Sequence, residues 1–363
     1  MIKIIKICLK TAVLGCISIF ALPSFGAPSE LGVAQQITQT SAEPDFKNSF
    51  QALLEKAKKG DSESQYMVGA IYLSGKLGVV DTKQGIYWLG KSASQGNTNA
   101  NYAMGVLHIG GKYAPLNPDK AIAYYTTAAQ LGHPLAQFNL GSILYSGTSG
   151  AKVDKKAAVE WLTKAASQNY PDAQYNLGLI MLSATQDQTQ RAQAIELIKK
   201  AASSGHTQAN YQLGKIYLEN QMQNSGSLKD ATEILKIAAS KKNAAANYSL
   251  GVIYFSGIGI DKNYELAHQY FNQGAKMWDK NAQFYLGIMN LQGLGTSKNI
   301  IEAQKWFDLS ASNGHEDAHI YRGLLSRTMS QEESKKAKAL AQEWFDSNHD
   351  TPHQHSGLDP HSH

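Results

Sequence analysis

The chain has 363 residues, of which 43% are hydrophobic and 17% charged, so it has enough apolar material for a folded core and does not have the composition of a disordered polypeptide. The formal net charge is +5, and it falls to +2 when residues 1–26 are set aside. No concentrated basic run remains, which excludes the basic face typical of a nucleic-acid-binding protein.

The N-terminal segment, residues 1–26, predicts a signal peptide. Three lysines precede the apolar run 11–22, which is shorter than the about 20 residues that span a bilayer. Ser24 and Gly26 supply the small residues at −3 and −1 of a cleavage site before Ala27. A lipoprotein signal ending at Cys16 is the alternative, although only five residues separate that thiol from the last lysine. We expect cleavage near Gly26/Ala27 and a periplasmic or secreted mature protein without a transmembrane segment.

Cysteine usage limits the ways in which the mature protein can be stabilised. Cys8 and Cys16 are the two cysteines of the sequence, and both lie in the expected signal peptide. The mature chain would therefore have no disulfide, although it enters a compartment that permits one. We expect its stability to come from packing.

The sequence after the signal segment predicts a linker and then a tandem repeat. Residues 27–44 are rich in Gln, Thr and Ser and predict a flexible linker, and residues 45–60 match the second half of a repeat unit. Full units begin near residues 64, 100, 136, 173, 209, 246, 282 and 318. A glycine recurs at intervals of 36 or 37 residues, at Gly69, Gly105, Gly141, Gly178, Gly214, Gly251, Gly287 and Gly323. A second column keeps the same phase, at Trp88, Tyr124, Trp161, Leu197, Ile234, Tyr270 and Trp306. Two columns in phase indicate a repeat array over residues 45–330.

Each unit predicts two helices, here called helix A and helix B. In the unit that begins near residue 136, helical periodicity predicts helix A over 134–146 and helix B over 155–168. The recurring glycine lies inside helix A, where glycine costs roughly 1 kcal/mol relative to alanine. We expect close approach of helix B to compensate for this cost.

The units are expected to stack on one another. One helix pair cannot bury its own apolar surface, so the sequence predicts an all-α fold, a right-handed α-solenoid superhelix of stacked two-helix repeats. Residues 331–346 predict a capping helix whose Trp344 is out of register with the repeat, and residues 347–363 form a His-rich tail.

The repeat pattern resembles a known family. Its form is Ala-x-x-x-Leu-Gly-x-x-Tyr-x-x-Gly-x-Gly, then Asp, then Ala…Trp…Lys-Ala-Ala-x-x-Gly-His, which is similar to the Sel1-like repeat, a relative of the tetratricopeptide repeat. The unit 136–169 carries it most clearly, with Leu140-Gly141, Asp154, Trp161 and Lys164-Ala165-Ala166. The units starting at Ala173 and Ala209 lack the loop glycines, and Lys242 and Trp278 replace the turn glycine.

The resemblance implies an exported scaffold or adaptor that is not an enzyme and needs no cofactor. The expected partner is a protein or peptide, either a host or an envelope protein, and the chain is expected to be a monomer. Family members exported by intracellular pathogens are linked with host-cell entry or trafficking. A cysteine-rich branch binds cell-wall or β-lactam-like compounds, so a ligand binder or weak hydrolase is the alternative. The mature chain lacks those cysteines, which weakens that alternative.

Two columns of helix A are candidates for a binding surface, because by analogy helix A lines the concave side of a helical-repeat solenoid. The first column is aromatic, at Tyr66, Tyr102, Phe138, Tyr175, Tyr211, Tyr248 and Phe284, and it is either a packing stripe or an aromatic groove. The next position varies between units, as a recognition surface requires. The candidate binding residues are Asn139, Asn176, Gln212, Ser249, Tyr285, Tyr175, Tyr211 and Tyr248. The alternative interpretation is a row of ordinary solvated side chains.

Two histidine patterns are candidates for metal sites. His315 and His319 form a literal H-E-x-x-H, but His315 stands in the turn between repeats where other units also carry histidine, so the repeat itself accounts for it. The tail offers His353, His355, His361 and His363 as weak metal candidates for a metal-binding envelope protein. The alternative for the tail is a solvated segment, and no catalytic residue is assigned.

Overall fold

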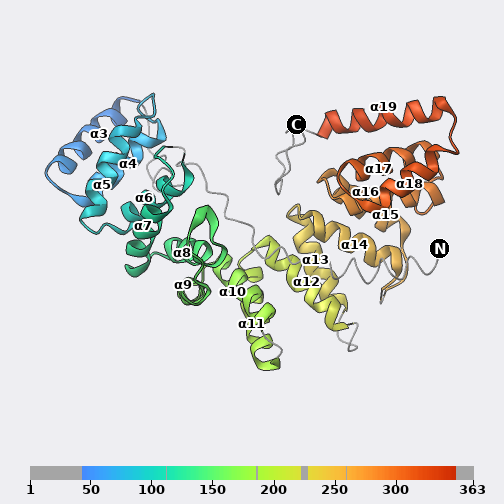
Figure 1. Cartoon of the computed structure of the whole chain (residues 1–363), viewed down its shortest axis with the longest axis horizontal. Helices are drawn as coiled ribbons and strands as arrows, with labels where there is room; N and C mark the ends of the chain where they lie inside the picture. Colours follow the sequence, from blue (N-terminus) through green and yellow to red (C-terminus); the bar gives the residue numbers. More distant parts are fainter. Residues whose placement is uncertain (1–42, 112, 185–186, 222–227, 259, 349–363) are drawn as a thin grey trace. The chain divides into compact units, whose positions relative to one another are not determined.

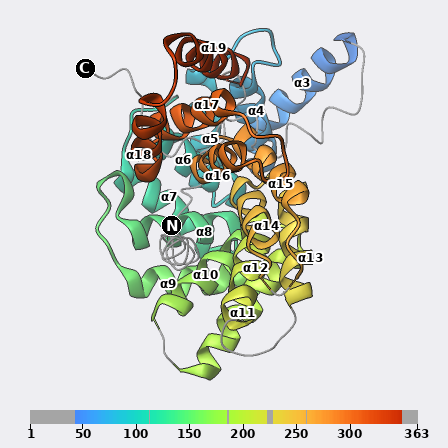
Figure 2. The same ribbon diagram turned by 90° about the vertical axis from the view of Figure 1, so that its right-hand side faces the viewer.

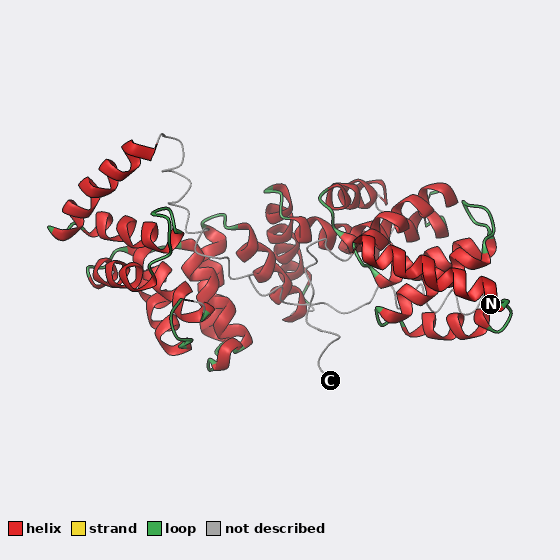
Figure 3. Cartoon of the chain, turned by 90° about the horizontal axis from the view of Figure 1, so that it is seen from above, coloured by secondary structure: helices red, strands yellow, loops and turns green. Residues whose placement is uncertain are grey.

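The computed structural model describes residues 43–348, apart from 112, 185–186, 222–227 and 259 (Figure 1). The expected signal peptide, nearly all of the expected linker and the four tail histidines lie outside the described residues. Within the described part of the chain, every regular element is a helix (Figure 3). None of these helices combines the length and the apolar character needed to cross a membrane.

The helices alternate between the two expected types. The first of each pair, helix A, is α4 (Ser62–Ser74), α6 (Thr98–Gly110), α8 (Pro134–Ser146), α10 (Pro171–Ala184), α12 (Thr207–Gln221), α14 (Ala244–Ser256), α16 (Lys280–Gln292) and α18 (Glu316–Ser326). The second, helix B, is α5 (Thr82–Ser94), α7 (Pro118–Gln130), α9 (Lys155–Ser167), α11 (Gln188–Ser203), α13 (Leu228–Ser240), α15 (Tyr264–Lys276) and α17 (Ile300–Ser312). A further helix, α3 (Glu43–Lys58), precedes them and α19 (Gln331–Asn348) follows them. Each helix A begins two residues before the residue that opens the sequence unit.

Consecutive helices pack against one another from α3 to α11 and from α12 to α18. The described residues divide into two compact units, 43–204 and 205–348. Within each unit, every helix B packs on the helix A before it, and also on the helix A after it where the same unit contains one. Figure 2 shows the same succession from α12 to α17. This packing confirms the predicted all-α solenoid of stacked helix pairs.

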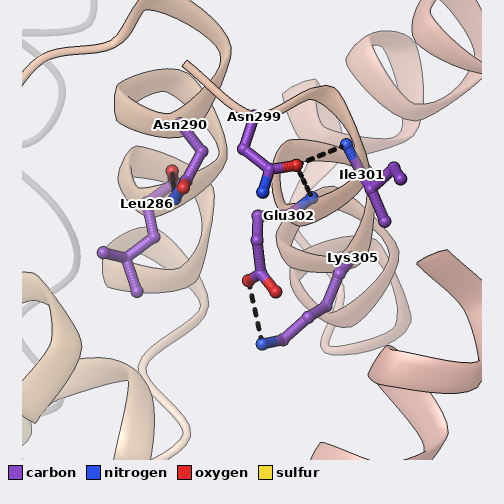
Figure 4. A network of polar contacts seen from close by, with 6 residues as sticks. All are labelled: Leu286, Asn290, Asn299, Ile301, Glu302 and Lys305. Atoms are coloured by element: carbon purple, nitrogen blue, oxygen red, sulfur yellow. Dashed lines mark hydrogen bonds and ion pairs between the residues drawn. The ribbon is translucent and has the colours of Figure 1, made fainter. Parts of the chain in front are cut away.

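The helix ends are capped by side chains at fixed positions of the repeat. The residue before helix A accepts a hydrogen bond from the backbone N–H three residues later, at Asp61, Asn97, His133, His206, Asn243, Asp279 and His315. Helix B uses the same device, as Asn299 shows by accepting from Ile301 and Glu302, both at 3.1 Å (Figure 4). Such caps satisfy backbone donors that the helix itself leaves unpaired.

The recurring glycine lets helix B approach helix A closely. A Cβ atom placed on Gly178 would lie 2.7 Å from Ile198 Cγ1 and 2.9 Å from the carbonyl oxygen of Ala194. Six further helix A glycines have an equally close neighbour, namely Gly69, Gly105, Gly141, Gly214, Gly251 and Gly287. The predicted close approach is therefore confirmed at seven positions, and Gly323 is the exception.

A column of buried amides joins each helix B to the next helix A in the unit 43–204. Gln137 Nε2 donates to the carbonyl oxygen of Ala129 at 3.0 Å, although the two residues belong to different helices. The equivalent bonds are Gln65 to Ala57, Asn101 to Ala93 and Gln174 to Ala166, at 3.0–3.3 Å. These amides are buried, so each bond satisfies two polar groups in the core. Sequence analysis missed this role, although a Gln or Asn directly after the opening residue recurs in the sequence.

Candidate functional site

In the unit 43–204, the candidate binding residues are buried. Asn139 on α8 is 6% exposed, and Asn176 and Tyr175 on α10 are 5% and 7% exposed. These side chains offer little surface to a partner, and a role for them in binding stays a prediction.

In the unit 205–348, the corresponding side chains are more open. Gln212 and Tyr211 on α12, Tyr248 and Ser249 on α14, and Tyr285 on α16 are all half-buried. Helices α14 and α16 also contact each other directly, although a helix B lies between them in the chain. This contact is expected when helix A forms the inner layer of a stacked array.

Tyr285 is the centre of an aromatic cluster. Its ring stacks on Phe271 with the centroids 4.8 Å apart, and it lies 5.4 Å from Phe255 and 5.9 Å from Tyr248. Tyr321 continues this row on α18, with its ring 5.4 Å from that of Phe284. We call the half-buried residues Tyr248, Phe255, Tyr285 and Tyr321 the aromatic face.

The aromatic face combines rigid apolar area with polar tips. Each ring contacts at least one other ring and is partly exposed. Tyrosine in such a position offers a large contact area at a small cost in conformational entropy, and its hydroxyl can hydrogen-bond to a partner. Sequence analysis missed Phe255, because its position belongs to neither of the two columns that were compared.

The aromatic column is divided between core and surface. Tyr66, Phe138 and Phe284 are buried with Tyr175, whereas Tyr102, Tyr211 and Tyr248 are half-buried. The Tyr102 ring stacks on the His133 ring at a centroid distance of 4.5 Å, so Tyr102 also has a packing role. The column therefore contributes core residues in some repeats and partly exposed residues in others.

His315 and His319 have separate environments. His315 caps α18, where its Nδ1 accepts a hydrogen bond from the backbone N–H of Ala318 at 3.3 Å, and its ring stacks on Phe284. His319 is exposed, with its Nδ1 3.4 Å from Arg322. Within residues 43–348, apart from the gaps given above, no three His, Cys, Asp or Glu side chains are grouped as metal ligands.

An open depression of about 430 Å³ lies in the unit 205–348. Its lining includes Lys236 and Glu233, which form an ion pair at 2.8 Å, together with Tyr254 and Lys262. The charges of this lining are mixed and solvated. It does not include any residue of the aromatic face.

Comparisons with known proteins place these features in a family context. The model of the family described as Sel1 repeat matches residues 62–97, 98–133, 134–170, 171–206, 244–277 and 280–315. A search of curated proteins gave no match.

Two solved structures share the fold over most of the chain. One is the crystal structure of c5321, described as a protective antigen present in uropathogenic Escherichia coli strains displaying an SLR fold. It is 26% identical over 86% of this chain and 68% of its own, with a TM-score of 0.74. The other is a Sel1 repeat protein from Oxalobacter formigenes, 23% identical over 88% of this chain and 90% of its own, with a TM-score of 0.64.

Proposed function

Because the chain belongs to the Sel1 repeat family, we propose that it is a non-catalytic scaffold that binds a protein partner through the helix A side of its repeats. The fold alone does not fix this function. The observation that carries the proposal is the aromatic face on α14, α16 and α18, because half-buried tyrosines are typical anchors of protein interfaces.

The proposed partner contributes a polypeptide segment. Tyr248 and Tyr285 lie on successive helix A elements with their rings 5.9 Å apart, and Ser249 stands beside them with a hydroxyl that can donate or accept. An extended or helical segment crossing these helices would meet apolar rings and polar tips in alternation. This arrangement supports peptide binding more than it supports a deep small-molecule pocket.

The proposed location is outside the cytoplasm. Residues 1–26 have the charge and apolar pattern of a signal peptide, and the E. coli protein of the same fold is described as a protective antigen. On these two grounds we propose a host or envelope partner for this chain. Export would be checked by N-terminal sequencing of the protein recovered from cell fractions, with Ala27 as the expected first residue.

Paired substitutions test the proposed surface. Introducing Gln212→Arg and Ser249→Arg places two bulky charges on the helix A side, and we expect recovery of the partner from cross-linked cells to fall at least about tenfold. The matched control introduces Ile237→Arg and Ser240→Arg into the helix B α13, where both residues are exposed. Circular dichroism establishes that both variants fold. Equal recovery by the two variants would contradict the assignment.

A further substitution set examines three candidate amides, the buried Asn139 and Asn176 of the unit 43–204 and the half-buried Gln212 of the unit 205–348. Replacing Asn139, Asn176 and Gln212 by alanine removes three groups that sequence analysis proposed as hydrogen-bond partners of a ligand. If they bind it, recovery falls without a change in melting temperature. A lower melting temperature, with the same amount of partner recovered per folded molecule, would assign Asn139 and Asn176 to packing.

A further inference from the structure

The helix A α18 has a face that no helix B covers. In the seven complete pairs, helix B lies over the recurring glycine of helix A. At Gly323, no described atom lies within 4 Å of a Cβ placed on the residue. Ile320 and Leu324 flank this glycine and are 59% and 57% exposed. The α18 surface is therefore an apolar, unoccupied helix B position within the described part of the chain.

The following helix, α19, carries the sequence of a helix B. Its segment Ala341-Gln342-Glu343-Trp344-Phe345-Asp346 matches Ala303-Gln304-Lys305-Trp306-Phe307-Asp308 of α17 at five of six positions. In α17, Phe307 is fully buried and lies over Gly287. Phe345 is its counterpart in sequence, yet 37% of it is exposed.

In the structure α19 packs against α17 instead of forming a pair with α18, as Figures 1 and 2 show. Its Trp344 ring lies 5.1 Å from that of Trp278 and 5.6 Å from that of Trp306. Phe345 meets Trp278 edge-on at 5.3 Å, and Trp278 Nε1 donates to the carbonyl oxygen of Asn348 at 3.3 Å. Trp278 is thus the main contact of the C-terminal end of α19.

Trp278 makes this contact from a strained backbone. Its φ is +62°, in the left-handed region, at the turn position where other units have Gly96, Gly132, Gly205 and Gly314. A residue other than glycine in that region costs on the order of 1 kcal/mol. The only turn with tryptophan in this position is also the one that holds α19, among the turns that the structure describes.

We propose that α19 has two docking positions: the observed one on α17 and Trp278, and a second one on α18 in which Phe345 lies over Gly323 and completes the last repeat. In the second position Ile320 and Leu324 become buried, while Trp278 and Trp306 become exposed. When α19 changes position, it therefore covers the apolar surface of α18 and uncovers the surface formed by Trp278 and Trp306.

The chain geometry allows the second position. In a complete repeat such as that of Gly287 and Phe307, the glycine and the residue that covers it are separated by a short stretch of chain. The stretch between Gly323 and Phe345 is slightly longer, so it can span the same distance. Residues 327–330 connect α18 to α19. The connection between α10 and α11 is one residue shorter, and those two helices form a full pair.

Trp278→Gly in the full chain tests the proposal, because it restores the turn glycine and removes the ring that holds α19. Hydrogen–deuterium exchange is measured over α18 and α19. We expect exchange of α18 to slow at least about tenfold while α19 stays protected. The control is Lys242→Gly, which replaces another residue of positive φ at the same turn position and should leave both helices unchanged. Loss of protection in α19 with no gain in α18 would overturn the proposal.

A second variant blocks the α18 position alone. Gly323→Leu fills the space that Phe345 would need, and it meets open space in the observed arrangement. Added to Trp278→Gly, it should abolish the protection of α18 and release α19. Protection of α18 that survives this change would also overturn the proposal.

A disulfide trap identifies the chain that supplies the helix. Gly323→Cys and Phe345→Cys are introduced together with Cys8→Ser and Cys16→Ser, which removes the natural thiols. Under oxidation we expect a cross-link within one chain, formed several-fold faster when Trp278→Gly is added. A covalent dimer, or no cross-link in either background, would contradict a second position for α19 within its own chain.

Discussion

Replacing the helix A glycine by alanine is expected to have opposite effects on stability at two equivalent positions of the repeat, Gly178 and Gly323. At Gly178 a methyl group would press on Ile198 and on the backbone of Ala194. We expect Gly178→Ala to destabilise, and Gly178→Leu to cost roughly 1–3 kcal/mol or more of unfolding free energy. Gly323→Ala meets no neighbour and should stabilise the helix by roughly 0.5–1 kcal/mol. Urea denaturation of the variants measures these differences, and effects of the same sign at Gly178 and Gly323 would contradict the packing argument.

The histidine caps make the folded state sensitive to acid. His133 accepts the N–H of Ala136 through Nδ1 at 3.2 Å, which requires an unprotonated nitrogen, and burial lowers the pKa of His133. Burial likewise lowers the pKa of His315. Because the folded pKa lies below the unfolded value of about 6.5, the stability that these caps contribute is complete above that pH and is lost as the pH falls below it.

His133→Asn tests this dependence, since asparagine is the cap at Asn97 and Asn243. Between pH 7.5 and 5 we expect the wild type to lose about 1 kcal/mol more stability than the variant, the value of one helix cap. Melting temperatures measured by circular dichroism across this range give the comparison. Parallel curves for the two proteins would show that the cap does not titrate.

Asp279 has the opposite pH behaviour. It caps α16 by accepting the N–H of Ala282 at 2.8 Å, and burial raises the pKa of Asp279 to about 6. The pKa of Asp279 is about 6 in the folded state and about 4 in the unfolded chain, so the unfolded chain loses its proton first as the pH rises. The free energy of unfolding therefore falls as the pH rises from about 4 to about 6. Asp279→Asn keeps the cap without the charge. It should add roughly 1–2 kcal/mol at pH 7 and almost nothing at pH 4, as measured by urea denaturation.

At the scale of elements, the sequence predicted the helix boundaries of the unit that begins near residue 136, because periodicity and caps are local signals. Helix A over 134–146 matches α8, and helix B over 155–168 exceeds α9 by one residue. The loops of the units that lack loop glycines fall partly outside the described residues. The close approach of helix B could also be predicted locally, because a glycine recurs inside helix A and has no Cβ atom to keep helix B away.

The packing of α19 could not be predicted from such patterns. The sequence shows an apolar stripe around Trp344, but it does not say which of two apolar neighbours receives it. In the structure α19 contacts Trp278, which belongs to a turn almost two repeats earlier in the chain. The exposure of the candidate site residues could not be predicted from such patterns either, because Asn139 and Ser249 hold equivalent positions in the repeat and yet differ in burial.

At the scale of the whole molecule, stability and function are both distributed over the stack. Within each unit, each helix B packs on the helix A elements beside it, and the close glycine contacts recur from one helix pair to the next. No disulfide of the mature chain can hold the stack together if residues 1–26 are removed. The proposed function belongs to the side chains that vary within this frame, among them the half-buried residues of the aromatic face.

Site-specific photo-cross-linking in the cell of origin tests the central claim, that the helix A side binds a polypeptide. A photoreactive amino acid is placed at Ser249 on α14 or, as the control, at Ile237 on α13, and the adducts are identified by mass spectrometry. We predict a discrete protein adduct from position 249 and none from position 237. Adducts confined to position 237, or equal at both positions, would contradict a partner that binds along the helix A side.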